Sequence, residues 1–283
     1  MKEEEGMRIS ALPRLIRLPN CLLAGLATWV GAWIAGEVEG LPVGLAITTA
    51  VLLTGFAMTV NDYYDREIDR INRPDRPIPS GAVSPKEAVR VAAGLAGAGL
   101  TTALFTNEAC FLVALLATGL AVAYSARIKR TGLPGNAVVA FNTALPFVYG
   151  SLATGQLAPL VCALALTAFF ATLGREVVKG VADIEGDRAL GVRTVAVVWG
   201  PGTAAGTAFG FIIAAVVVAE VAALLLQLGV AYVVTVSVAG VGLLVEAGRV
   251  LRTPHLAVAY SAKNRMLGWM GVALLGFLLE AAL

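Results

Sequence analysis

Two groups of polar residues in this chain have the types and spacing needed to hold a metal ion. The first contains Asn61, Asp65 and Asp69, which recur every four residues, with Asp62 three residues before Asp65. Side chains with this spacing lie along one face of a helix. Carboxylate and amide oxygens suit Mg²⁺, which proteins usually hold through one or two carboxylates together with substrate phosphates.

The second group contains Asp183 and Asp187, again four residues apart, with Arg175 and Lys179 upstream at the same spacing. One such group alone would favour a solvated loop in which acids balance nearby arginines. Two groups, each following a long apolar segment, instead indicate a bound cation, because clustered carboxylates at a membrane end repel one another unless a cation screens them. A metal beside a membrane points to a lipid-linked phosphate as substrate.

Basic residues near both groups are candidate phosphate partners, because their side chains form charge-assisted hydrogen bonds with phosphate oxygens. They are Arg66, Arg73, Arg76, Arg127, Lys129, Arg175, Lys179 and Arg193. Two neutral residues have two interpretations each. Tyr124 either aims its hydroxyl or ring at the site or belongs to the interfacial aromatic belt. Asn20 either lines the same cavity or caps a helix after Pro19.

The elements that must position these residues are membrane-spanning helices. The chain has 283 residues, of which 58% are hydrophobic and 14% are charged, whereas soluble domains carry about 25% charged residues. Its apolar runs have the length that crosses a bilayer as a helix. We predict nine spans, at 20–38, 41–60, 88–106, 109–126, 135–154, 159–174, 204–227, 229–248 and 267–283.

The basic residues predict the orientation of these spans. Every Lys and Arg lies before the first span or after an even-numbered one. The positive-inside rule then places the N-terminus in the cytoplasm and the C-terminus outside the cell membrane. We predict one all-α domain over 1–283, a bundle around a central cavity that opens to the cytoplasmic side. It has a solvated tail over 1–13 and two cytoplasmic active-site loops over 61–87 and 175–203.

Two local patterns predict finer detail. Ser84, Pro85 and Glu87 form the pattern of a capped helix start at the end of the first long loop. Closely spaced glycines predict tight packing between helices in lipid. The clearest examples are Gly94, Gly97 and Gly99 in one span, and Gly206 and Gly210 in another.

Both acidic motifs resemble signatures of a known family. Residues 61–69, with the sequence Asn-Asp-Tyr-Tyr-Asp-Arg-Glu-Ile-Asp, and the Asn72-Arg73-Pro74 that follows resemble the first signature of UbiA-type intramembrane prenyltransferases. The run from Arg175 and Glu176 through Lys179 to Asp183 and Asp187 resembles the second. The nine spans, and the motifs after the second and sixth of them, match as well. The resemblance therefore covers nearly the whole chain.

The resemblance implies a Mg²⁺-dependent transfer of an isoprenoid from its diphosphate. The implied ligands of a Mg²⁺ that bridges the diphosphate are Asn61, Asp65, Asp69, Asp183 and Asp187, and Asp62 joins them as a candidate catalytic residue. Charge on the leaving group would be drawn off by Arg66, Lys129 and Lys179. The family also has a Tyr-x-x-x-Lys element after its fourth helix. From Tyr124 to Lys129 this chain is one residue longer, so either Arg127 or Lys129 fills the basic position.

Within the family, residues 17–21 and 132–136 look most like archaeal members that make ether lipids. Those members join a geranylgeranyl group to the hydroxyl of geranylgeranylglyceryl phosphate. The implied partners are a polyprenyl diphosphate donor, an anionic lipid-like acceptor and the lipid bilayer, with no nucleic acid and no obligate protein partner. We expect Asn72, Arg73 and Arg76 to bind the phosphate of such an acceptor.

Three other functions are compatible with a membrane protein rich in aspartate. A prenyltransferase of quinone or haem-type biosynthesis differs only in its aromatic acceptor. CDP-alcohol phosphotransferases require Asp-Gly followed by Ala-Arg, whereas Asp65 here precedes Arg66 and Glu67. A cation transporter usually binds its ion near the membrane midplane, whereas these carboxylates lie at the ends of the spans.

Overall fold

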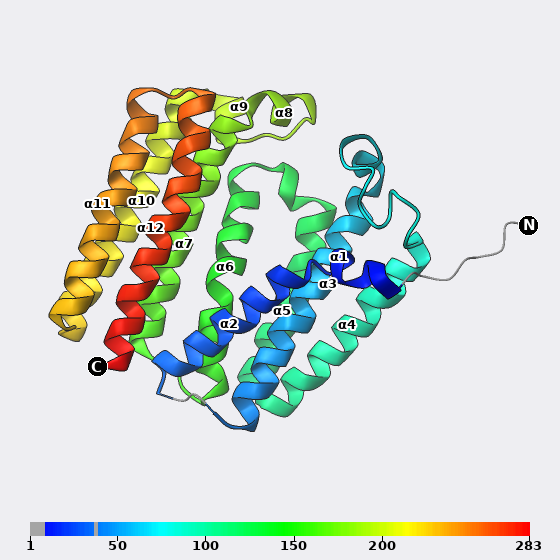
Figure 1. The fold of residues 1–283 in the computed structure, drawn as a ribbon, viewed down its shortest axis with the longest axis horizontal. Coiled ribbons are helices and arrows are strands. Elements are labelled where there is room, and N and C mark those ends of the chain that lie inside the picture. Colours follow the sequence, from blue (N-terminus) through cyan, green and yellow to red (C-terminus); the bar gives the residue numbers. More distant parts are fainter. Residues whose placement is uncertain (1–8, 37–38) are drawn as a thin grey trace, which may run out of the picture.

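The computed structural model describes residues 9–36 and 39–283, and every regular element in these two ranges is a helix (Figure 1). In chain order the elements are η1 (Ile9–Ala11), α1 (Leu12–Leu15), α2 (Leu18–Ile34), α3 (Leu41–Asn72), α4 (Pro85–Thr106), α5 (Glu108–Ala126), η2 (Ile128–Arg130), α6 (Leu133–Ala153), α7 (Pro159–Ala182), α8 (Ile184–Ala189), α9 (Val195–Trp199), α10 (Pro201–Leu226), α11 (Val230–Arg252) and α12 (Leu256–Ala282). The predicted all-α class is therefore confirmed over these ranges.

Nine of the helices in the described ranges are long, and each overlaps one predicted span. Seven of them are long and apolar enough to cross a membrane, namely α3, α4, α5, α7, α10, α11 and α12. Helix α2 has only 17 residues. Helix α6 carries Asn136, Asn142 and Pro146 and falls outside that set of seven. The protein is thus a multi-pass helical membrane protein, and the figure of nine crossings stays a prediction.

Helix α7 lies at the centre of the bundle, and 61% of its most apolar stretch is buried. It packs against α6, α10 and α12, and α11 packs against α10 and α12. On the other side α3 packs against α2, α4 and α5, as Figure 1 shows. Helices α2 and α6 pack against each other, and α6 joins the two groups through its contact with α7.

The crossing of α2 and α6 depends on two glycines that the sequence patterns did not single out. A Cβ at Gly31 would collide with the carbonyl of Phe147, and a Cβ at Gly150 would collide with the carbonyl of Thr28. The backbones can approach so closely only because neither residue has a side chain. The expectation from the spaced glycines was mostly wrong. A Cβ at Gly99 would meet Leu53, but Gly94, Gly97, Gly206 and Gly210 face open space.

Both acidic motifs lie largely on helices rather than in loops. Helix α3 continues to Asn72, and α7 continues to Ala182. The predicted loops over 61–87 and 175–203 are therefore shorter than expected. The reason is that hydropathy marks where a segment leaves the apolar region, whereas a helix continues until its backbone conformation changes. The capping box of Ser84 and Glu87 at the start of α4 is confirmed.

The predicted solvated tail over 1–13 is wrong for its described residues. Residues 1–8 lie outside the described ranges. Residues 9–15 form η1 and α1, and Leu15 is fully buried against Ile78, Val83 and Ala88. This short segment is therefore packed onto the first long loop, where it borders the site described next.

Candidate active site

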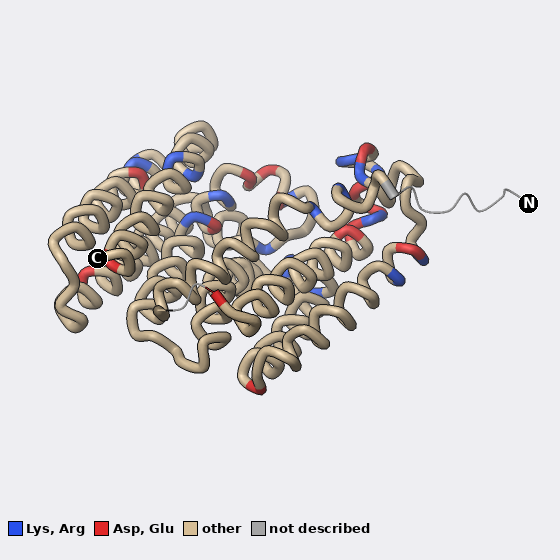
Figure 2. The backbone as a smooth tube through the Cα atoms, turned by 60° about the horizontal axis from the view of Figure 1, so that its bottom comes forward, with Lys and Arg blue, Asp and Glu red and all other residues tan. Residues whose placement is uncertain are grey.

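The motif-bearing ends of α3 and α7 lie at the same end of the bundle, together with η2 and α8 (Figure 1). Figure 2 shows most Lys and Arg positions, drawn in blue, along this end. Acidic and basic side chains therefore meet on one surface, where they can form a site for a charged ligand.

Two carboxylates of the first motif are buried and bonded to arginines. Arg17 Nη2 donates to Asp62 Oδ1 at 2.6 Å. Arg76 Nη1 donates to Asp69 Oδ2 at 2.5 Å and to Asp62 Oδ1 at 3.3 Å. A carboxylate this deeply buried requires such partners, because an unpaired buried charge is strongly destabilising. Asp62 and Asp69 are therefore already neutralised by the protein.

The third carboxylate, Asp65, faces η2 and is paired with Lys129. Arg127 is exposed, and its side chain forms no ion pair in the described ranges. Of the two basic residues that the sequence left undecided, Lys129 is therefore the one that reaches the first motif. Tyr124, on the last turns of α5, is close enough to both Asp65 and Glu176 to interact with their charges. It is partly buried between the two motifs, which favours a site residue over a belt aromatic.

Helix η2 also connects the two motifs through the backbone. The amide of Arg193, just after α8, donates to the carbonyl of Arg130 at 3.1 Å. Gly132 lies against the carbonyl of Arg193 so closely that a Cβ would collide with it, and its φ of 75° suits glycine. The short segment 128–132 thus has two contacts. It holds Lys129 against the first motif, and it binds the chain that follows the second motif through Arg130 and Gly132.

The second motif lies at the junction of α7 and α8. Asp183 is the residue between the two helices and is 43% exposed in its side chain, and Lys263 Nζ of α12 lies 3.7 Å from its Oδ1. Asp187 forms no ion pair among the described residues. Burial and the charge of Asp183 raise the pKa of Asp187, while Lys179 and Thr194 partly offset the shift. The second motif therefore retains negative charge that is not neutralised.

The basic residues just upstream point toward other partners. Arg175 donates from Nε to the carbonyl of Lys263 at 3.0 Å and from Nη1 to Glu176 at 3.2 Å. Lys179 Nζ lies 3.4 Å from Glu176 Oε2 and is exposed. Glu176 therefore gathers both basic side chains of the second motif.

Several predicted residues lie at the margin of this arrangement. Arg66 lies over the ring of Tyr63, 4.5 Å from its centroid, and donates to the carbonyl of the same residue. Asn20 is exposed, and the only side-chain hydrogen bond described for it is a long one of 3.8 Å from Nδ2 to the sulfur of Met58. Asn72 is exposed at the end of α3, and Asn61 is half-buried one turn before Asp65.

The residues present fit a magnesium ion that also binds substrate phosphates. No group of three or more His, Cys, Asp or Glu side chains in the described ranges is arranged as a complete metal site. Mg²⁺ does not require one, since it often takes one or two carboxylates and completes its shell with phosphate oxygens and water. Asp183 has only Lys263, at 3.7 Å, and Asp187 has no ion pair among the described residues, so these two carboxylates are the ones best able to take up a metal ion. Asp69 is available to a metal only if Arg76 releases it.

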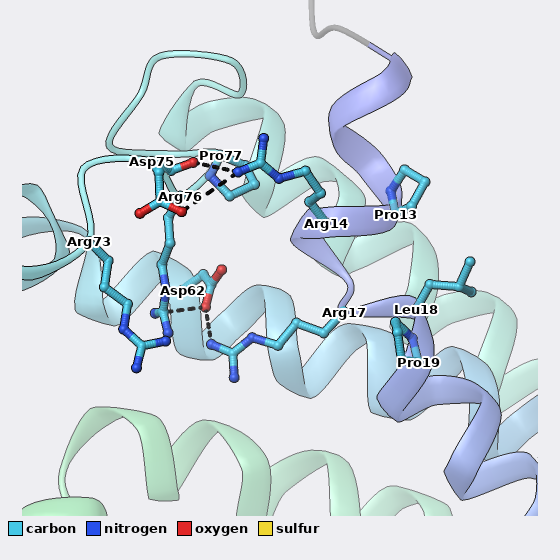
Figure 3. Close-up of a pocket in the computed structure, with 10 residues that line it drawn as sticks. All are labelled: Pro13, Arg14, Arg17, Leu18, Pro19, Asp62, Arg73, Asp75, Arg76 and Pro77. Carbon is cyan, nitrogen blue, oxygen red and sulfur yellow. Dashed lines mark hydrogen bonds and ion pairs between the residues drawn. The ribbon is translucent and has the colours of Figure 1, made fainter.

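A pocket of about 550 Å³ lies beside the first motif, between α1, the start of α2 and the loop after α3 (Figure 3). Its lining includes Arg14, Arg17, Asp62, Arg73 and Arg76. Arg17 has a left-handed backbone, with φ 50° and ψ 61°. For a residue other than glycine this conformation costs about 1–3 kcal/mol and recurs at ligand-binding sites.

Three residues of this region were missing from the predicted site: Arg17, Glu176 and Lys263. Arg17 and Glu176 stand within or beside the sequence motifs, which is a usable signal. Lys263 had no such signal, because it lies 76 residues or more from every member of the second motif and meets it only through the packing of α12 on α7.

Two membrane-region acids have roles apart from both motifs. Glu246 on α11 is buried and bonded to Arg265 at 2.8 Å and Arg249 at 3.2 Å. Glu220 accepts a hydrogen bond from Ser237 at 2.8 Å. These contacts join α11 to α12 and α10 to α11, so we interpret both acids as structural.

Comparison with known proteins identifies the family. The UbiA prenyltransferase family matches residues 24–275. Digeranylgeranylglyceryl phosphate synthase of Ignicoccus hospitalis is 38% identical over 98% of this chain and 93% of its own length. The enzyme of the same name from Natronomonas pharaonis is 38% identical over 89% of this chain and 92% of its own.

Solved structures share the fold. One described as digeranylgeranylglyceryl phosphate synthase in membranes has a TM-score of 0.89 and 27% identity, covering 96% of this chain and 98% of its own. A UbiA homologue from Archaeoglobus fulgidus, solved with GPP and Mg²⁺, has a TM-score of 0.66 and 20% identity, covering 94% and 99%. The chain belongs to the UbiA prenyltransferase family.

Proposed function

We infer that this protein transfers a geranylgeranyl group from geranylgeranyl diphosphate to the hydroxyl of geranylgeranylglyceryl phosphate, a step of archaeal ether-lipid synthesis. The observation that carries the inference is full-length similarity to synthases of that product, combined with two acidic motifs and their basic partners at one end of the bundle. A cation transporter has no need for the basic partners that accompany these carboxylates.

Residues of both motifs bind the donor diphosphate. Asp183, Asp187 and Asn61 would hold Mg²⁺, together with Asp65 once Lys129 turns from that carboxylate to the diphosphate. When bound, Mg²⁺ neutralises charge that develops on the departing diphosphate. Asp69 remains a candidate ligand, although its bond to Arg76 argues for a supporting role.

Basic residues around the diphosphate lower the barrier to loss of the allylic group. Lys129 is paired with Asp65, and the Lys129 ammonium can reach phosphate oxygens that bind beside that carboxylate. Lys179 and Arg66 add positive charge at the two margins. Preorganised charges of this kind stabilise the leaving group as its negative charge grows. The reactive prenyl cation must also be kept from water, which the apolar helices around the site accomplish.

The acceptor and the orientation follow from the same charge distribution. Basic residues gather at the motif-bearing end, so we place that end in the cytoplasm and the C-terminus outside. The central cavity opens toward the same side. The acceptor phosphate lies on the arginine-rich flank of α3, with Arg73 and Arg76 as its nearest partners, and the acceptor hydroxyl faces the donor.

Product identification tests this function directly. The purified protein, in lipid nanodiscs, is given geranylgeranyl diphosphate with geranylgeranylglyceryl phosphate or with a panel of aromatic acceptors, and products are identified by mass spectrometry. We expect product only with the glyceryl phosphate, and only when Mg²⁺ is present. Prenylated aromatic products would assign the protein to quinone or haem-type biosynthesis instead. Ion flux in vesicles without diphosphate release would indicate transport.

A further inference from the structure

The pocket beside α1 has a lining that suits a phosphate monoester carried by a lipid. We propose that it binds the phosphate of the lipid acceptor, that Arg17 of the N-terminal segment completes a site that Arg73 and Arg76 begin, and that Arg14 holds this segment to the loop at Asp75. The proposal rests on the acceptor class inferred above. It assigns a binding role to residues that lie between the predicted tail over 1–13 and the first long helix, α2.

The lining of the pocket is rich in charged side chains. The pocket is lined by four arginines, Arg14, Arg17, Arg73 and Arg76, and by two aspartates, Asp62 and Asp75. Asp69, which lies outside the lining, also pairs with Arg76, so four positive charges less three negative charges leave +1. A phosphate monoester carries about −1.5 to −2 at pH 7. The pocket therefore has a net positive charge that attracts this group.

The guanidinium groups are held in place and still have free donors. Arg17 uses Nη2 on Asp62, and Arg76 uses Nη1 on Asp62 and Asp69. Each guanidinium has five N–H donors, so most of them remain available. The side chain of Arg73 is exposed and makes no ion pair in the described ranges. Figure 3 shows the guanidinium groups of Arg17, Arg73 and Arg76 close together on one side of Asp62.

The backbone of Arg17 is strained. Its left-handed conformation is one that residues other than glycine rarely adopt, and such conformations concentrate at ligand clamps. The strain turns the chain between α1 and α2 so that the Arg17 side chain reaches the buried Asp62. Arg14, one turn earlier, donates to the carbonyl of Asp75 at 2.8 Å across the pocket.

An apolar track leads from the pocket along α2, which favours a lipid over a soluble phosphate. Leu18 lines the pocket and is 37% exposed. Leu22 and Leu26 follow at four-residue spacing and are 58% and 55% exposed. Residues with this spacing form one stripe on a helix. A ligand with its phosphate in the pocket can therefore lay a hydrocarbon chain along α2 toward the bilayer.

The pocket is also adjacent to the donor side without overlapping it. Arg76 bonds both Asp62, in the pocket lining, and Asp69, one turn before the end of α3. Asp65 faces the other flank and Lys129. A phosphate in the pocket thus lies on one flank of α3 and the diphosphate on the other, which leaves the acceptor hydroxyl to reach between them.

Equilibrium binding without donor tests the proposal. Full-length protein in phosphatidylcholine nanodiscs is titrated with geranylgeranylglyceryl phosphate, with its dephosphorylated alcohol and with phosphatidic acid. The first variant is Arg73→Ala, chosen because the Arg73 side chain is exposed and packs in no core. The second is Arg17→Lys, which keeps a positive charge beside Asp62. Arg252→Ala removes an exposed cytoplasmic-side charge far from the pocket and serves as the matched control.

We expect both pocket variants to weaken binding of the phosphate acceptor by about tenfold or more, the value of a charge-assisted hydrogen bond. Binding of the alcohol and Mg²⁺-dependent binding of geranylgeranyl diphosphate should not change, and Arg252→Ala should match the wild type. The proposal is overturned if the variants weaken donor binding instead, or if Arg252→Ala weakens acceptor binding as much as they do. It is also overturned if phosphatidic acid binds as tightly as the acceptor and its affinity falls as much in each variant.

This outcome is separable from that of the proposed function. If the wild type binds the acceptor through these arginines but forms no product from it, the binding role of the pocket is supported and the proposed function is wrong. If product forms normally and neither pocket variant changes the acceptor KM, the proposed function is supported and the binding role of the pocket is wrong.

Discussion

The two acidic motifs have similar spacing but differ in how their charge is balanced. In the first motif each of Asp62, Asp65 and Asp69 is paired with a basic residue from another element. In the second motif Asp183 has one distant partner at 3.7 Å, and Asp187 has no ion pair among the described residues. The first motif is largely neutralised by the protein, whereas the second is neutralised only in part.

The difference follows from the surroundings of each motif. The end of α3 is enclosed by α1, the loop after α3 and η2, all of which carry Arg or Lys. The junction of α7 and α8 is more open, and its basic neighbours Arg175 and Lys179 are held by Glu176. We infer that the second motif contributes more to metal binding and that the first contributes more to placing cations around the substrates.

The largest expected effect comes from removing charge at the second motif. Asp183→Asn and Asp187→Asn each should lower turnover by about 10²–10³-fold, because each removes a proposed ligand of the metal ion that stabilises the developing charge. Initial rates of product formation at saturating substrates measure this. Glu185→Gln is the matched control, since Glu185 is exposed and lies between the two aspartates. An equal loss in the control would mean that general negative charge matters, not these two ligands.

A smaller effect is expected where the first motif meets η2. Lys129→Gln should lower kcat/KM for the donor by about 10–100-fold, because it removes a charge-assisted contact to a phosphate and leaves Asp65 without its partner. Arg127→Gln should have a much weaker effect, since that side chain is exposed and unpaired in the described ranges. Steady-state kinetics with varied donor measures both. The reverse ranking would show that Arg127 is the basic partner.

The connection between the motifs is tested by Gly132→Ala. The new Cβ would collide with the carbonyl of Arg193, so the chain after α8 must move away from η2. We expect donor affinity to fall several-fold. Gly155→Ala controls for positive-φ strain, which costs about 1–2 kcal/mol, because Gly155 has φ 83° but faces open space. Donor binding and thermal unfolding of both variants measure the difference. Equal donor affinity in the two variants would contradict the role of this contact.

The smallest effect on activity is expected at Glu246, a third buried acid with two arginine partners. Glu246→Gln should change turnover and donor affinity by less than about twofold, while stability falls by about 1 kcal/mol, since both partners are more than a third exposed and solvent screens the pairs. Activity assays and thermal unfolding measure the two quantities. A loss of turnover comparable with that of Asp187→Asn would place Glu246 in the active site.

Much of the fold was predictable because its signals are local. Runs of apolar residues marked all nine long helices of the described ranges, and Ser84 with Glu87 marked the start of α4. The positions where α3 and α7 end were not predicted. Charged residues mark where a span leaves the membrane, whereas both helices continue beyond that point.

The candidate site was predictable only where its residues stand close together in the sequence. The four-residue spacing of Asp183 and Asp187 was visible at once. The bond from Arg17 to Asp62 joins residues 45 positions apart, and it depends on a strained turn that no composition or period reveals. The approach of Lys263 to Asp183 depends on how α12 packs against α7. Local spacing identified the ligand chemistry, whereas tertiary packing determined which charges remain free.

In the proposed function, both acidic motifs bind the same diphosphate through Mg²⁺. A double-mutant cycle tests it most directly, with Mg²⁺-dependent binding of geranylgeranyl diphosphate measured for the wild type, Asp65→Asn, Asp183→Asn and the double variant. Residues that share one ligand should show a coupling energy of about 1 kcal/mol or more, whereas independent sites add to within about 0.5 kcal/mol. We predict coupling that disappears when Mg²⁺ is chelated. Strictly additive losses, with or without Mg²⁺, would contradict a shared site.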